Sequence, residues 1–204
     1  MTHHLPLHVI TIISLVVTLV MHRRQNMPCR LGGPICLSKA FWLHYTLFTW
    51  FFFVPYILWQ LPEAPVSYRA VWWSLTASFW IRGVAELYML FVSRNWTPII
   101  GISHDLFTLA LMVGTLAYTG LPEGAPPVLS WFTASLFLSV VVETHHAHSF
   151  FKIMKGRTAG DEAMWYAHEG DPRFRTIILT TTVFNWILYA GLASCYIRYF
   201  VLAS

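Results

Sequence analysis

The sequence is poor in charge. Of its 204 residues only 11% are Asp, Glu, Lys or Arg, whereas a soluble domain carries about a quarter. The hydrophobic fraction is 56% and the mean hydropathy is +0.56. These values argue against a soluble globular domain, and they also exclude disorder, collagen-like repeats and coiled coils. The composition therefore predicts a polytopic membrane protein.

Signatures of several function classes are missing. The chain has no phosphate-binding Gly-x-x-x-x-Gly-Lys loop, no dinucleotide-binding Gly-x-Gly-x-x-Gly fingerprint and no Gly-x-Ser-x-Gly nucleophile turn. It also lacks a basic stripe interleaved with aromatic residues, so we expect no nucleic acid as partner. Three cysteines are present, and Cys29 and Cys36, with six residues between them, match no common zinc pattern. We expect both to be free thiols.

Six long apolar runs dominate the chain, and Pro and Gly mark the turns between them. Their approximate ranges are 5–21, 40–61, 71–93, 98–119, 128–151 and 177–201. Each has ~17–25 residues, enough for a helix to cross a hydrocarbon core of ~30 Å. We predict an all-α bundle of six spans that forms one integral membrane domain over residues 1–204. The first run has no small-residue cleavage site after it, so we expect it to stay as an anchor.

The positive charges predict the orientation. Ten of the 13 Lys and Arg residues lie on one side of the predicted spans. They are Arg23, Arg24, Arg30, Lys39, Arg94, Lys152, Lys155, Arg157, Arg173 and Arg175. Cytoplasmic loops carry such an excess, so we predict that the N- and C-termini are outside. The membrane is expected to be a bacterial inner membrane or an organelle membrane. Trp59, Trp72, Trp73 and Trp96 are expected in the interfacial belts.

Ionisable side chains inside four of the runs point to a site. Each costs at least ~2.5–3.5 kcal/mol at mid-span, so each needs a partner or a purpose. They are His44 in the second run, Arg82 and Glu86 in the third, His104 and Asp105 in the fourth, and Glu143 and His146 in the fifth. A helix rises ~1.5 Å per residue, which places the histidines and glutamates about 6–12 Å below the cytoplasmic boundary. We therefore predict one polar layer that faces the cytoplasmic side.

Helical spacing aligns these residues with small polar ones. The shared faces are Ser74, Ser78, Arg82 and Glu86; Gly101, Asp105, Thr108, Thr115 and Thr119; Ser139, Glu143 and His146; and Thr182, Asn185 and Tyr189. Lipid cannot satisfy polar groups, so we expect these faces to point into the bundle.

The leading hypothesis is a metal centre. Glu143 and His146 form a Glu-x-x-His pair, a spacing that carboxylate-bridged di-iron bundles use. The predicted metal ligands are Glu86, His104, Asp105, Glu143 and His146, for iron, zinc or manganese. The predicted catalytic groups are Arg82, Glu86 and Asp105, and the predicted cofactor-binding residues are His44, His104 and His146. Such a site predicts a metal-dependent oxidoreductase that acts on a lipid-like substrate within the membrane lipid.

Three alternatives remain open. His44, with His104 or His146, is a candidate pair of axial ligands for a b-type haem, with Arg82 on a propionate. Glu86 or Glu143 is a candidate metal-free acid or base that acts on a lipid. Lastly, the polar layer is also compatible with helix packing alone. The chain would then be a non-catalytic subunit, haem-binding or proton-conducting, of a larger complex with other membrane subunits.

Overall fold

The structure is a computed structural model that describes residues 4–23, 37–61, 64–93, 98–121, 123–154 and 175–202. All regular structure in these ranges is helical, and they contain no strand. The elements are α1 (Leu5–Arg23), α2 (Leu37–Phe48), η2 (Thr49–Phe53), α3 (Val54–Gln60), α4 (Val66–Tyr88), η3 (Met89–Ser93), α5 (Pro98–Thr119), α6 (Pro127–Met154), α7 (Arg175–Tyr196) and η6 (Ile197–Val201). The η segments are π-helical turns.

Local sequence explains several boundaries. Pro98 and Pro127 begin α5 and α6, because the first turn of a helix does not need the missing N–H. Gly120 follows α5 with φ +77°, a left-handed conformation that suits glycine at a helix end. Pro55 lies in the rod formed by α2, η2 and α3. Since proline lacks the N–H and its ring crowds the preceding turn, a wider π turn directly before it is a natural accommodation.

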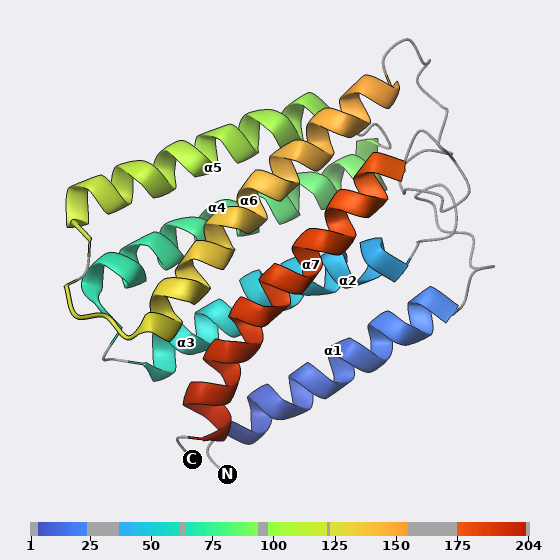
Figure 1. The fold of residues 1–204 in the computed structure, drawn as a ribbon. Coiled ribbons are helices and arrows are strands. Elements are labelled where there is room, and N and C mark those ends of the chain that lie inside the picture. Colours follow the sequence, from blue (N-terminus) through green and yellow to red (C-terminus); the bar gives the residue numbers. More distant parts are fainter. Residues whose placement is uncertain are drawn as a thin grey trace.

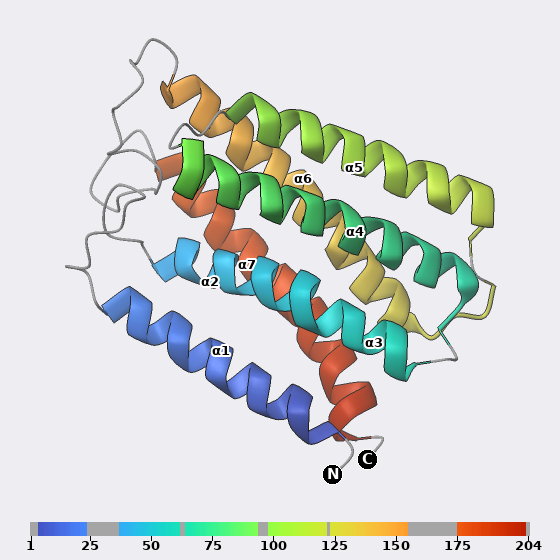
Figure 2. The same cartoon turned by 180° about the vertical axis from the view of Figure 1, so that it is seen from behind.

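The helices form a ring with one helix outside it. Along the ring, α4 packs on α5, α5 on α6, α6 on α7, α7 on α2, and the α2–η2–α3 rod on α4. Helix α1 lies at the edge of the bundle against α2 (Figure 1). Successive rods run in opposite directions, and both labelled termini lie at the same end (Figures 1 and 2). The arrangement thus brings the polar faces of α4, α5 and α6 together.

The distribution of apolar side chains is that of a membrane protein. Large apolar residues cover the outside, where Trp59 is 83% exposed and Trp186 is 77% exposed. Polar residues such as Asp105 and Thr108 are fully buried. Within the described ranges, four helices are long and apolar enough to cross a membrane: Ala40–Gln60, Ile99–Thr119, Pro127–Ser149 and Arg175–Val201. The apolar part of α1, Leu5–Val20, is shorter, and α4 carries Arg69, Arg82 and Glu86.

The buried core is aromatic, and this corrects one expectation about the tryptophans. Trp72 is fully buried and its Nε1 donates to Thr133 Oγ1 at 3.1 Å, so its expected place in an interfacial belt is wrong. Trp59 and Trp73 are exposed, while Trp96 lies outside the described residues. Trp72 is buried because its apolar ring packs against Phe132 while its one N–H finds a hydroxyl on α6.

Candidate functional site

A charged cluster lies where α4, α5 and α6 meet. Arg82 of α4 donates through Nη1 to Asp105 Oδ1 on α5 and through Nη2 to Glu143 Oε2 on α6, the latter at 3.4 Å. One guanidinium therefore holds two carboxylates from two neighbouring helices. Thr46 of α2 adds a further contact by donating to Glu143 Oε1 at 3.3 Å.

Small residues make room for the guanidinium. A Cβ atom added to Gly101 would lie 3.5 Å from Arg82 Nη2 and 3.6 Å from the Cβ of Ala147. Gly101 lies one helical turn before Asp105, so the same face of α5 supplies both the space and the carboxylate. Small residues at helix contacts allow this close approach in membrane bundles.

His104 extends the cluster toward α4. Its Nδ1 lies 3.3 Å from Asp105 Oδ1, and since a carboxylate only accepts, this nitrogen carries the hydrogen. Its Nε2 lies 2.8 Å from the backbone oxygen of Ser78 and 3.0 Å from the Ser78 hydroxyl. Nε2 therefore lies between a carbonyl, which only accepts, and a hydroxyl, which either donates or accepts.

The four charged or titratable side chains differ in burial. Asp105 is completely buried, whereas the Arg82, Glu143 and His104 side chains are 11%, 12% and 14% exposed. Asp105 is thus the most deeply buried of the four, and each of the other three keeps a small accessible area. The second carboxylate oxygen, Asp105 Oδ2, is buried without a hydrogen-bond partner among the described residues. It has the capacity to accept one further donor.

Two predicted polar faces meet beside this cluster. Ser78 Oγ lies 2.6 Å from Thr108 Oγ1, and Ser74 Oγ lies 3.4 Å from Thr115 Oγ1. These contacts join α4 and α5 along the faces that the helical spacing had grouped. The contact between Ser78 and His104 was not predicted. Ser78 does lie one helical turn before Arg82 on the same face of α4, and this spacing could have indicated it.

The other two predicted histidines lie in separate surroundings. His44 of α2 lies between α1 and α7, with Nε2 at 2.9 Å from Ser14 Oγ and Nδ1 at 2.6 Å from the Tyr189 hydroxyl. His146 of α6 faces α7 and α2, where its Nε2 lies 2.5 Å from Thr181 Oγ1 and its ring contacts Trp42 edge-on. The polar layer is therefore divided into three parts. Glu86 belongs to α4, but its side chain lies outside the described residues.

The described geometry does not fit a metal ion. Among the side chains that the structure describes, no group of three or more His, Cys, Asp or Glu residues is able to hold one. Asp105 Oδ1 and Glu143 Oε2, two of the predicted ligand atoms, already accept from Arg82. A guanidinium between two carboxylates takes the place that a cation would need, and its charge repels a second cation.

A haem does not fit either. An axial histidine needs one ring nitrogen free to bind iron, whereas both nitrogens of His44 and of His104 lie within hydrogen-bond distance of protein groups. Both predicted axial pairs include His44, so neither pair offers two such nitrogens. We therefore derive no chemistry from a bound metal or haem.

Comparisons with known proteins give no information about the function of this cluster. The chain matches no protein family, no curated protein and no solved structure. The function is therefore argued from the cluster itself.

Proposed function

We propose that the chain is an integral membrane protein of six spans, with both termini outside. The described helices support this proposal because successive rods run in opposite directions and the termini share one end. The ten Lys and Arg residues predicted on one side of the spans are compatible with a cytoplasmic position for the end of the bundle that lies away from the termini. In this orientation the cluster of Arg82, His104, Asp105 and Glu143 lies in the cytoplasmic half, in a bacterial inner membrane or an organelle membrane.

Within that frame, we infer that the cluster performs metal-free proton transfer on a lipid-like substrate. The observation that carries this inference is the placement of His104 Nε2 between the Ser78 hydroxyl and the Ser78 carbonyl. A substrate group that replaces the Ser78 hydroxyl at Nε2 would lie within reach for proton transfer, while the carbonyl would keep the ring in place. Asp105 orients the ring from its Nδ1 side, as carboxylates do in hydrolase triads.

The remaining residues have roles that follow from charge and exposure. Arg82, which is 11% exposed, is placed to stabilise negative charge that develops on a substrate. The lipid-like substrate follows from the environment, because the helices around the cluster present apolar surfaces to their surroundings.

A second candidate is a non-catalytic subunit of a larger membrane complex. The observation in its favour is that Arg82, Asp105, Glu143 and His104 all find partners within the chain. Such a closed network is also what helix packing alone requires. The experiment below separates the two functions.

The test follows carbon-bound deuterium. Purified protein is incubated in D2O with lipids extracted from its source membrane, and mass spectrometry detects lipids that keep deuterium after return to H2O. We expect labelling by the native protein and by Thr115→Val, a variant in the same α4–α5 contact but away from the cluster. His104→Gln should lower the rate by ~10²–10⁴-fold, the usual contribution of acid–base catalysis.

Three other results would contradict metal-free proton transfer. If the native protein labels no lipid, and His104→Gln instead loses partner proteins on native gels, the subunit function is correct. Stoichiometric iron, zinc or manganese in the purified protein, lost in Glu143→Ala/His146→Ala, would overturn the metal-free mechanism. A haem absorption band would do the same.

A further inference from the structure

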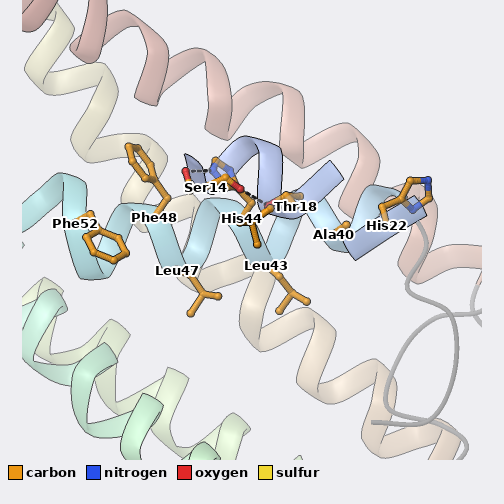
Figure 3. Close-up of a pocket in the computed structure, with 10 residues that line it drawn as sticks. Ser14, Thr18, His22, Ala40, Leu43, His44, Leu47, Phe48 and Phe52 are labelled. Carbon is orange, nitrogen blue, oxygen red and sulfur yellow. Dashed lines mark hydrogen bonds between the residues drawn. The ribbon is translucent and has the colours of Figure 1, made fainter. Parts of the chain in front are cut away.

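An apolar groove of about 240 Å³ lies between α1 and α2, away from the charged cluster. Its walls are mostly apolar and include Val17 of α1. They also include Leu43, Leu47, Phe48 and Phe52 (Figure 3). Several of these side chains are still exposed: Leu47 to 55%, Val17 to 48% and Phe52 to 45%. An occupant of the groove would bury them further.

The polar groups in the groove wall are already engaged with each other. His44 Nε2 and Ser14 Oγ are 2.9 Å apart, and the other ring nitrogen lies 2.6 Å from the Tyr189 hydroxyl. The Thr18 hydroxyl donates to the backbone oxygen of Ser14 at 2.9 Å. The middle of the groove therefore presents carbon surface, which favours a hydrocarbon chain over a polar ligand.

The length of the groove matches one leaflet of a bilayer. Its α2-side lining extends from Ala40 to Phe52, which corresponds to about 18 Å at ~1.5 Å per residue. Half of a hydrocarbon core of ~30 Å is about 15 Å. A volume of 240 Å³ is also below the ~300–1,000 Å³ of pockets that take whole drug-sized ligands. The groove therefore has room for one chain and not for a complete lipid.

The end of the groove is basic. His22 lines it at the C-terminal end of α1, and the exposed Arg23 follows directly. Figure 3 shows His22 at one end of the lining residues and Phe52 at the other. The ten lining residues contain no Asp or Glu. This charge is complementary to a phosphate at the membrane surface.

We propose that the groove binds one acyl chain of an anionic phospholipid, whose phosphate contacts His22 and Arg23. The chain lies along Leu43, Leu47 and Phe52, and the headgroup lies at the end of α1. This site is independent of the proton transfer proposed above, because none of its residues belongs to the charged cluster.

The test uses two lipids with the same chains and different headgroups. The protein is incorporated into mixed micelles of equal phosphatidylglycerol and phosphatidylcholine, and bound lipid is counted by native mass spectrometry. We expect one retained phosphatidylglycerol, favoured over phosphatidylcholine by fivefold or more, since each basic residue near an anionic headgroup contributes about 1 kcal/mol. His22→Gln/Arg23→Gln should keep a lipid but lose the preference.

Leu43→Trp fills the groove and should abolish retention. The matched control is Ile12→Trp, which places the same side chain on the exposed face of α1, where Ile12 is 62% exposed. Both variants should elute as the native protein does on size exclusion. Equal retention by Leu43→Trp, equal binding of the two lipids by the native protein, or a dimer that occupies the groove in place of lipid would each overturn the proposal.

Discussion

At the residue scale, the molecule depends on one arginine that compensates two carboxylates. Arg82 is 11% exposed and contacts the completely buried Asp105. Desolvation of such a pair is expensive, so the pair itself adds little net stability. Removal of one partner is costly because it leaves the other charge in a medium of low dielectric constant.

The first prediction concerns Asp105→Asn. The amide keeps the size of the side chain but removes the charge of one partner of Arg82, which keeps Glu143 as its other partner, and it weakens the acceptor for His104 Nδ1. We expect a loss of about 1.5–3 kcal/mol in the free energy of unfolding, the usual contribution of a hydrogen bond to a charged group. This loss appears as a lower apparent melting temperature in detergent.

Glu123→Gln is the matched control. Glu123 is exposed in the turn between α5 and α6, so removal of its charge should change stability by less than about 0.5 kcal/mol. Equal effects of the two variants would show that the buried pair has no special role.

At the scale of the elements, small residues set how closely helices approach. Gly191 of α7 is buried against α6, where an added Cβ would lie 2.7 Å from the Cβ of Ser135. Ser135 is itself buried, and its hydroxyl donates to the backbone oxygen of Phe132 at 2.7 Å. Since Cβ atoms cannot approach this closely, any larger residue at 191 forces the two helices apart.

The second prediction is therefore that Gly191→Ala destabilises the protein. Overpacking of this kind costs about 1–3 kcal/mol, which outweighs the better helix propensity of alanine. Gly114→Ala on α5 provides the comparison, because nothing lies within 4 Å of its added Cβ, and it should be neutral or stabilising. Thermal unfolding of both variants measures the difference, and equal melting temperatures would contradict the tight α6–α7 contact.

At the scale of the whole molecule, the question is which end faces the cytoplasm. The third prediction is that a membrane-impermeant maleimide reaches Cys29 and Cys36 only after intact membranes are opened. Glu123→Cys, in the turn at the opposite end of the bundle, should instead react from outside without opening. The positive-inside rule is the physical reason. Labelling of the native cysteines in sealed cells or organelles, with Glu123→Cys protected, would reverse the orientation.

Much of the fold was predictable because apolar length and turn residues act locally. The described helices overlap the six apolar runs. Where a helix begins several residues away from its predicted boundary, the cause is local. Helix α4, for example, begins at Val66 and not near residue 71, because a helix tolerates Ser67 and Arg69 in its first turns when they lie near a membrane surface. The faces of Ser78 and Thr108 also followed from helical spacing, and they are in contact.

The partners of the ionisable residues were not predictable to the same degree. The sequence predicts one depth for the residues of the candidate site, because predicted depth follows from position along each helix. Which ones meet depends on the rotation of each helix and on its neighbours in the ring, and neither is encoded in spacing along one helix. His146 lies on the predicted face with Glu143, yet it contacts Thr181 of α7 while Glu143 contacts Arg82 of α4.

The sequence by itself therefore determined that the chain is all-helical with long apolar helices, since hydrophobicity and helical period act within a segment. Only the tertiary structure decided that Arg82 joins Asp105 and Glu143, that His104 faces Ser78, and that His44 borders a separate groove. Contacts between helices are set by side-chain packing across the bundle, where a glycine such as Gly101 admits a guanidinium from a neighbouring helix.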